Sequence, residues 1–251
     1  MVQAYNVVPV LLKIDQKIVE ELKCRDSLSD HLLEEIKNLE TAVLLLLRNL
    51  TSGSDESSEE VIRSGGQALL AMFSARMCDD EPKLRSYCCN MAKNITAGTA
   101  SQVRFVARAT EVVSALLSTL EEGPLEDDED HSDVWGFAAE ALLYILTNVP
   151  PSDYFKLCQA TDRRLVKAIC QQVLAFPERE PELIPFALEA MESSVDRLSD
   201  DSQKKKKAML WKMWRDEGAL ALLDQLSQHE DADTSEGAKT TASFFSSCLE
   251  N

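Results

Sequence analysis

Hydrophobic residues recur at helical spacing along most of this chain of 251 residues. Over residues 39–50, 84–95 and 134–145 they follow the pattern i, i+3, i+4, i+7, i+8, i+11. This pattern places apolar side chains along one side of an α-helix. No window of comparable length alternates polar and apolar residues with period two, so the sequence predicts an all-α fold without a sheet.

Polar, Gly-rich or Pro-rich segments divide these helical stretches from one another. Shorter stretches of the same periodicity cover residues 106–120, 165–176, 184–198 and 218–226. The longest break, Glu121–Asp133, has the sequence EEGPLEDDEDHSD and predicts an acidic loop. Ten or so helices joined by short loops are therefore expected, either as a bundle or as a stack of repeats.

Three of the predicted helices end on a similar motif, which favours repeats over a bundle. The motif reads Leu-Arg-Asn-Leu-Thr around Asn49, Ala-Lys-Asn-Ile-Thr around Asn94 and Leu-Thr-Asn-Val around Asn148. The Asn residues are 45 and 54 residues apart, close to the ~40–47 residues of large helical repeats. The sequence thus predicts an α-solenoid, in which each repeat buries its apolar side against its neighbours.

A second set of motifs resembles the armadillo-repeat family. Residues 61–66, Val-Ile-Arg-Ser-Gly-Gly, are followed by Leu69, Met72 and Phe73, as in the turn and Leu-rich helix of these repeats. Residues 94–102, Asn-Ile-Thr-Ala-Gly-Thr-Ala-Ser-Gln, are similar to the Asn-Ile-Ala-x-Gly-Thr-x-x-Gln of importin-type armadillo repeats, and Glu217-Gly218-Ala219-Leu220 repeats the turn. Glycine suits such a sharp turn because it tolerates unusual backbone angles.

The resemblance implies a right-handed α-solenoid of about four to five armadillo-like repeats, with residues 1–251 forming one domain. The match extends over 39–149 and 210–250, whereas 150–203 shows only helical periodicity and is expected to form irregular helices. The pattern also departs from the family in the third unit, where Ala109 stands at the position of a turn glycine.

The family also implies which side chains bind a partner. In peptide-binding armadillo proteins an Asn of the inner helix holds the peptide backbone, and a Trp four residues earlier forms a pocket. Asn49, Asn94 and Asn148 stand at the Asn position, while Leu45, Asn90 and Tyr144 stand at the Trp position, so only Tyr144 is aromatic there. The candidates for the groove are therefore Asn49, Asn94, Asn148, Tyr144 and Asn90. Alternatively, the three Asn residues of the motif cap helix ends.

No pattern in the sequence indicates catalysis, a metal site or a cofactor site. The three His residues are not spaced at i, i+4 from another His or a Cys, and the neighbours Cys88 and Cys89 would point about 100° apart on a helix. Gly65-Gly66 lacks the Lys-Ser/Thr of a phosphate-binding loop, and no Gly-x-Ser-x-Gly motif is present. We expect no catalytic residues, no metal and no cofactor, and a protein that is not an enzyme.

Net charge and cysteine usage limit the partner and the compartment. The formal charge is −17, from 43 acidic and 26 basic residues, and such a surface repels nucleic acid and anionic lipid. Seven Cys residues without a Cys-x-x-Cys pair indicate free thiols in a reducing compartment. The longest apolar run, residues 42–47, is far shorter than a ~20-residue membrane span. The sequence predicts a protein of the cytoplasm or nucleus that binds another protein, through a basic or an extended segment.

One basic cluster, Lys204–Lys207, precedes two tryptophans, Trp211 and Trp214. It has the composition of a nuclear-import signal or of a basic amphipathic helix that calmodulin binds. The interpretation we adopt is a solvated start of a helix whose two tryptophans pack into the last repeat.

Taken together, these patterns predict a non-enzymatic adaptor that binds a partner protein or an extended peptide in the concave groove of the solenoid. One alternative is an armadillo-type regulator or exchange factor that grips a chaperone or a small GTPase. Another is a helical domain that encloses a small-molecule pocket.

Overall fold

The computed structural model describes residues 7–24, 28–123, 133–178, 180–196 and 204–247, and within these ranges every regular element is a helix. The predicted all-α fold is therefore confirmed. The helices are α1 (Val7–Leu22), α2 (Asp30–Thr51), α3 (Asp55–Arg76), α4 (Pro82–Thr96), α5 (Ala100–Ala107), α6 (Thr110–Glu122), α7 (Asp133–Asn148), α8 (Pro151–Ala160), α9 (Arg164–Ala168), the π-helical η3 (Ile169–Leu174), α10 (Leu183–Asp196), α11 (Lys204–Asp216), α12 (Ala219–Leu226) and α13 (Ala232–Ser247).

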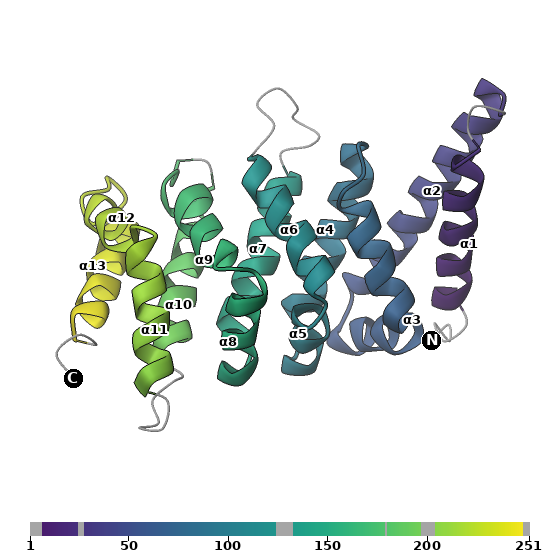
Figure 1. Ribbon diagram of the computed structural model, residues 1–251. Coiled ribbons are helices and arrows are strands. Elements are labelled where there is room, and N and C mark those ends of the chain that lie inside the picture. The colour runs from purple at the N-terminus through teal and green to yellow at the C-terminus, as the bar shows by residue number, and fades with distance from the viewer. Residues whose placement is uncertain (1–6, 25–27, 124–132, 179, 197–203, 248–251) are drawn as a thin grey trace.

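The helices stack along one axis as a solenoid, with the N-terminus at one end and the C-terminus at the other (Figure 1). In the described part of the chain, a pair formed by α1 and α2 precedes four units, and each unit closes on one long helix: α4, α7, α10 and α13. Each of these long helices packs against the long helix of the unit before it, beginning with α4 against α2. The predicted solenoid of about four to five repeats is thus confirmed.

Glycine makes the sharp corner inside the first and last full units. Helix α3 is kinked at Gly66, which has φ 47° and ψ −130°, and Gly218 precedes α12 with φ 87°. These are the two turns that the sequence predicts. In the next unit Ala109 makes the corner with φ −87°, an ordinary value that needs no glycine. In the unit after that, Asp162 and Arg163 take positive φ angles of 45° and 66° between α8 and α9.

The apolar sides of the helices form one elongated core that runs through every unit. Its large, fully buried side chains include Leu47, Phe73, Ile95, Leu116 and Trp214. Each unit buries its apolar side against the next unit, which is why the helical spacing of the sequence persists through residues 150–203. That segment forms α8, α9, η3 and α10, and its irregular element is the π-helical turn η3.

Two further predictions concern the tryptophans that follow the basic cluster and the acidic loop. Trp211 and Trp214 are buried, so they pack into the last unit as predicted and are not displayed on a basic amphipathic helix. Of the predicted acidic loop, residues 124–132 lie outside the described residues. Helix α6 ends before them and helix α7 begins after them.

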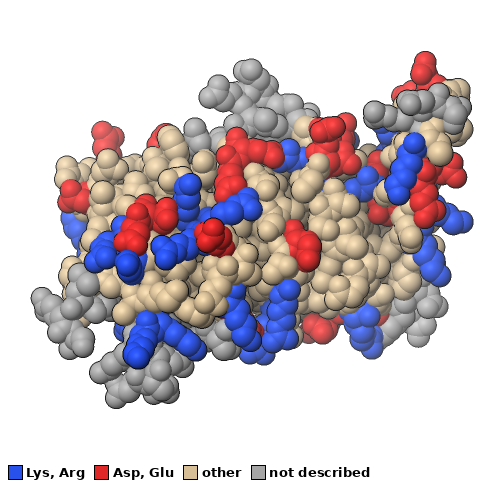
Figure 2. Space-filling model, viewed as in Figure 1, with Lys and Arg blue, Asp and Glu red and all other residues tan. Residues whose placement is uncertain are grey.

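On the face that Figure 2 shows, acidic and basic side chains are both present with uncharged surface between them. No helix of the described residues combines the length and the apolar character that crossing a bilayer requires.

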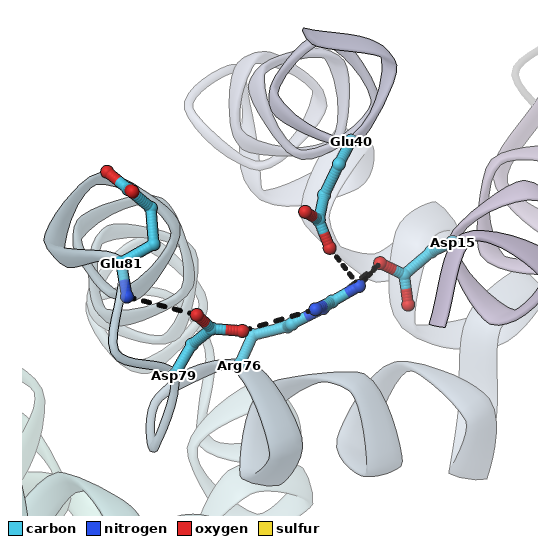
Figure 3. Close-up of polar contacts among 5 residues, drawn as sticks. All are labelled: Asp15, Glu40, Arg76, Asp79 and Glu81. Atoms are coloured by element: carbon cyan, nitrogen blue, oxygen red, sulfur yellow. Dashed lines mark hydrogen bonds and ion pairs between the residues drawn. The ribbon is translucent and has the colours of Figure 1, made fainter. Parts of the chain in front are cut away.

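A buried ion-pair cluster joins the N-terminal pair of helices to the first full unit (Figure 3). Arg76, at the end of α3, donates to Asp15 of α1 at 3.0 Å, forms an ion pair with Glu40 of α2, and contacts Asp79 at 3.3 Å. The side chains of Arg76, Asp15 and Glu40 are only 7%, 7% and 2% exposed. One guanidinium therefore holds three helical segments together through three carboxylates.

Burial raises the pKa of Glu40 above its usual value, and the Arg76 guanidinium opposes this effect. The charged form of Glu40 is thus less favourable in this site than in water, although Glu40 is paired.

Candidate binding face

The long helices α2, α4, α7, α10 and α13 stand side by side and form what we call the long-helix row (Figure 1). In α7, at the middle of the row, the described residues that are not buried are Phe137, Glu140, Tyr144, Thr147 and Asn148. Their spacing of three and four residues places them along one side of the helix. We call this solvent-facing side of the long-helix row the row face.

The same side can be followed in α4 and α2 through the spacing of the Asn motifs. Asn94 is half-buried in α4, Asn148 is half-buried at the end of α7, and Asn49 is exposed in α2. Asn90 and Tyr144, four residues before the Asn in their helices, are half-buried as well. Residues i and i+4 lie on the same side of a helix. All five candidates from the sequence therefore lie on the row face.

Neither Asn49 nor Asn94 caps its helix. Helix α2 continues to Thr51 and α4 to Thr96, and at each end a Thr hydroxyl donates to a backbone carbonyl one turn earlier, from Thr51 to Arg48 at 2.8 Å and from Thr96 to Ala92 at 2.9 Å. The Asn94 amide instead donates to the side-chain oxygen of Asn90 at 3.1 Å. The interpretation of these two residues as helix caps is therefore wrong.

Three contacts on the row face were not predicted from the sequence, and each joins two neighbouring long helices. The Arg48 guanidinium of α2 lies 5.3 Å from the ring centroid of Tyr87 in α4. The rings of Tyr144 in α7 and Phe186 in α10 meet edge-on, with centroids 6.0 Å apart. The third contact is between α4 and α7 and, like the first, places a cation over an aromatic ring. Aromatic side chains thus line the row face, although the Trp position of the family is aromatic only at Tyr144.

Lys93, which precedes Asn94 as Arg48 precedes Asn49, makes the contact between α4 and α7. Its ammonium lies 4.9 Å from the ring centroid of Phe137 and 3.1 Å from a carboxylate oxygen of Glu140. A cation over an aromatic ring and beside a carboxylate is held in place by both. The signal in the sequence was a basic residue directly before the Asn in two of the three motifs.

The row face changes in charge along its length. At the α2 and α4 end it carries the cations Arg48 and Lys93, each placed over a ring. In α10, Glu189 follows Phe186 by three residues and is exposed. Because this spacing returns to the same side of a helix, the Glu189 carboxylate lies beside Phe186 on the row face. Burial, together with the nearby Glu140 carboxylate, raises the pKa of Tyr144. Its phenol, like an ordinary tyrosine, can donate a hydrogen bond at neutral pH.

Two open clefts of the described chain lie away from these candidates. One has a volume of about 740 Å³ and lies between α3, α5 and α6, where Phe105 and Arg108 are part of its lining. The other, of about 810 Å³, lies between the ends of α1, α2 and α3 and is lined by Glu40 and Asp79 among others. None of the five candidates lines either cleft.

The buried thiols of the described chain are poorly suited to chemistry. Cys88 and Cys89 are fully buried side by side in α4, where they pack in the core as predicted. Burial raises the pKa of Cys89 to about 12, and it raises the pKa of Cys158 to about 12 as well. At neutral pH these thiols stay protonated, and the thiol is a much weaker nucleophile or metal ligand than the thiolate.

Comparison with solved structures identifies the architecture. A designed armadillo repeat protein aligns with 95% of this chain and 91% of its own, with a TM-score of 0.60 and 17% identity. The chain has the armadillo-repeat fold. A computationally designed armadillo repeat protein for modular peptide recognition aligns over the same shares with a TM-score of 0.61 and 19% identity. A third, designed and in complex with the peptide (KR)4, gives 0.60 and 18%.

No protein-family model matches the sequence, and no curated protein matches it either. The armadillo fold is thus shown by the structure, at sequence identities below one fifth. The long-helix row consists of the helices that close successive units, together with α2, and Asn49, Asn94 and Asn148 lie in three of these helices.

Proposed function

We propose that this armadillo-fold protein is a non-enzymatic protein-binding module whose row face receives an extended segment of a partner. The observation that carries the proposal is the register of Asn49, Asn94 and Asn148. They recur at equivalent positions of three successive long helices, on the side that faces solvent. The surface needs no catalytic group for this purpose, only amides and rings at repeated positions.

An amide side chain suits the backbone of an extended peptide. It carries one acceptor oxygen and two donor hydrogens, so it can pair with the N–H and the C=O of one peptide unit. Asn94 and Asn90 already form one such donor–acceptor pair with each other, which orients the Asn94 amide. Successive long helices are about 10 Å apart in packed helices, close to three residues of an extended chain. A ladder of amides would therefore meet an extended peptide at regular intervals.

The charge of the protein favours a basic segment as the partner. The formal charge is −17, and the exposed Glu189 lies on the row face beside Phe186. The designed armadillo protein that aligns with this chain is in complex with an alternating Lys-Arg peptide, which supports the same chemistry here. The polyanionic backbone of nucleic acid would be repelled. The buried free thiols Cys88, Cys89, Cys158 and Cys170 fit a reducing compartment, and we infer a cytoplasmic or nuclear setting.

The test replaces the two half-buried amides and measures binding of a peptide of eight alternating Lys and Arg residues. In the double variant Asn94→Ala/Asn148→Ala we expect the affinity to fall about 5- to 150-fold, since each lost amide contact costs about 0.5–1.5 kcal/mol. Asn and Ala are both uncharged, so long-range attraction for the peptide stays the same. The matched control is Gln67→Ala, an exposed amide in the cleft between α3 and α5.

Stability decides how the result is interpreted. The denaturation midpoint of the double variant should stay close to that of the unchanged protein, because the two side chains are half-exposed. Equal affinity of a folded double variant and the unchanged protein would rule out the amide ladder. Failure of the unchanged protein to bind the peptide would rule out the basic extended segment.

A further inference from the structure

The N-terminal end of the long-helix row exposes a stripe of leucines. Leu32, Leu39 and Leu46 of α2 are 42%, 49% and 52% exposed and are seven residues apart. Seven residues are close to two helical turns, so the three side chains form one line along the helix. Helix α1 adds Val7 and Val10, 40% and 53% exposed, at the same end of the solenoid. We call these five residues the apolar end.

The equivalent positions of the next long helices are buried. The shift of 45 residues that relates Asn49 to Asn94 relates Leu39 to Leu84 and Leu46 to Met91, which are 4% and 0% exposed. The further shift of 54 residues leads to Ala138 and Ile145, both 0% exposed. In α4 and α7 the preceding long helix covers this side. Helix α2 therefore presents the surface that a long helix uses to receive a neighbour.

The other end of the solenoid has the opposite character. The exposed residues of α13 are small or polar: Ala232, Asp233, Glu236, Lys239, Thr240, Ser243, Ser246 and Ser247. Solenoids need polar outer surfaces on their terminal repeats to remain soluble. The last helix, α13, meets this need in its described part, whereas the apolar end does not, and exposed apolar surface of this kind marks an interaction site.

We propose that the apolar end pairs with the apolar end of a second copy of this chain, with the two α2 helices antiparallel across a two-fold axis at Leu39. The stripe is symmetric about its centre, because Leu32 and Leu46 lie seven residues before and after Leu39. In such a pair Leu39 meets the partner's Leu39, and Leu32 meets the partner's Leu46. A two-fold contact requires a self-complementary surface of this kind.

Charge along α2 selects the antiparallel direction. The first half of the helix carries Asp30, Glu34 and Glu35 against one Lys, Lys37, whereas Arg48 is the only charged residue after Glu40. A parallel pair would bring the acidic halves together, while an antiparallel pair brings each acidic half beside the half of the partner that carries Arg48. The helix dipoles also oppose each other in the antiparallel pair, which is favourable.

The arrangement has a consequence for the row face. Lys37 and Arg48 lie about half a turn around helix α2 from Leu39. Because Arg48 contacts the Tyr87 ring of α4, the leucine stripe points away from α4 within the row. The two-fold axis between the antiparallel helices is then perpendicular to the plane of the long-helix row. Both row faces point to the same side, and the two rows join into one longer surface.

The first test measures mass by sedimentation equilibrium over a range of protein concentrations, at ~0.15 M salt to screen the repulsion between two copies of charge −17. We expect twice the 28.0 kDa of the chain. Leu39→Glu should raise the dimer dissociation constant by on the order of 100-fold or more, because each copy loses apolar burial at the axis. The matched control Leu220→Glu changes an exposed leucine of α12 and should leave the dimer intact.

A chain that stays monomeric throughout would overturn the proposal and assign the apolar end to a helix of another protein. Dissociation by Leu220→Glu as much as by Leu39→Glu would overturn it too, and so would a dimer that Leu39→Glu leaves unchanged. Helical circular dichroism of each variant confirms that it is folded.

The second test determines the direction of pairing by cysteine cross-linking. In a background in which the exposed Cys24 and Cys78 are changed to Ser, we expect Leu39→Cys to cross-link with itself. Leu32→Cys should cross-link with Leu46→Cys when the two variants are mixed, and neither should cross-link alone, because equal positions would lie ~21 Å apart. Cross-linking of Leu32→Cys with itself would indicate a parallel pair and overturn the proposed arrangement.

Discussion

Gln102 donates from its side-chain amide to the backbone carbonyl of Asp55 at 2.7 Å, so the first helix of one unit holds the start of the unit before it. The other end of the same amide accepts from the backbone N–H of Thr99 at 2.9 Å and completes the N-terminal cap of α5. A Cβ at Gly98 would lie 1.8 Å from the Gln102 side-chain oxygen, so this position must be glycine for Gln102 to adopt its conformation. The Gly-Thr-x-x-Gln part of the armadillo-like motif is therefore a structural link between units.

We predict that Gln102→Leu destabilises the protein by roughly 0.5–1.5 kcal/mol for each hydrogen bond lost, here those to the Thr99 N–H and the Asp55 carbonyl. Leu has nearly the volume of Gln, so the loss reports the hydrogen bonds and not a cavity. Urea denaturation measures it, with the exposed Gln67→Leu as the matched control, expected within about 0.5 kcal/mol of the unchanged protein. Equal midpoints for the two variants would contradict a linking role for Gln102.

The corners inside the units give a second prediction. Gly66→Ala should cost about 1–3 kcal/mol through backbone strain alone, because φ is 47° and a Cβ there would meet nothing within 4 Å. Ala109 holds the corresponding corner of the next unit at φ −87°. Ala109→Gly should therefore also destabilise the protein, by about 0.5–1 kcal/mol through the entropy of the unfolded chain. Thermal denaturation of both variants checks this, and a stabilising Ala109→Gly would contradict it.

The sequence predicts the features of this fold that depend on residues close together in the chain. Helical spacing and the recurring Asn predicted the solenoid, its glycine corners and the positions of Asn49, Asn94 and Asn148, because each depends on residues close together in sequence. The contacts of Tyr87 and Phe137 with cations of the preceding long helix depend on how neighbouring helices are aligned. Spacing along one helix does not determine that alignment, so the sequence did not predict these contacts.

The ion-pair cluster was beyond sequence reasoning for the same reason, because Asp15 and Arg76 are 61 residues apart. We predict that Arg76→Met costs about 3–5 kcal/mol, since it removes the one cation from a buried group of carboxylates. Arg48→Met is the control: this Arg is half-buried over the Tyr87 ring on the row face and should cost no more than about 1 kcal/mol. Denaturation midpoints measure both, and a loss at Arg76 as small as that at Arg48 would show that the cluster does not hold α1 and α2 in place.

The last prediction concerns Glu40 and pH. Burial raises the pKa of this carboxyl in the folded protein above the usual 4.5, so the folded state binds the proton more tightly than the unfolded state does. The contribution of Glu40 to stability is therefore fully present below pH 4.5 and is lost as the pH rises through its folded pKa. Asp15 and Asp79 also pair with Arg76.

We expect Glu40→Gln, which removes the charge and keeps the shape, to be at least as stable as the unchanged protein at pH 7. Its advantage should shrink as the pH falls through the folded pKa and vanish below 4.5, where Glu40 is protonated in both states. Denaturation midpoints of the two proteins across this range measure the difference. An advantage that grows toward low pH would show that the Arg76 ion pair outweighs burial at Glu40.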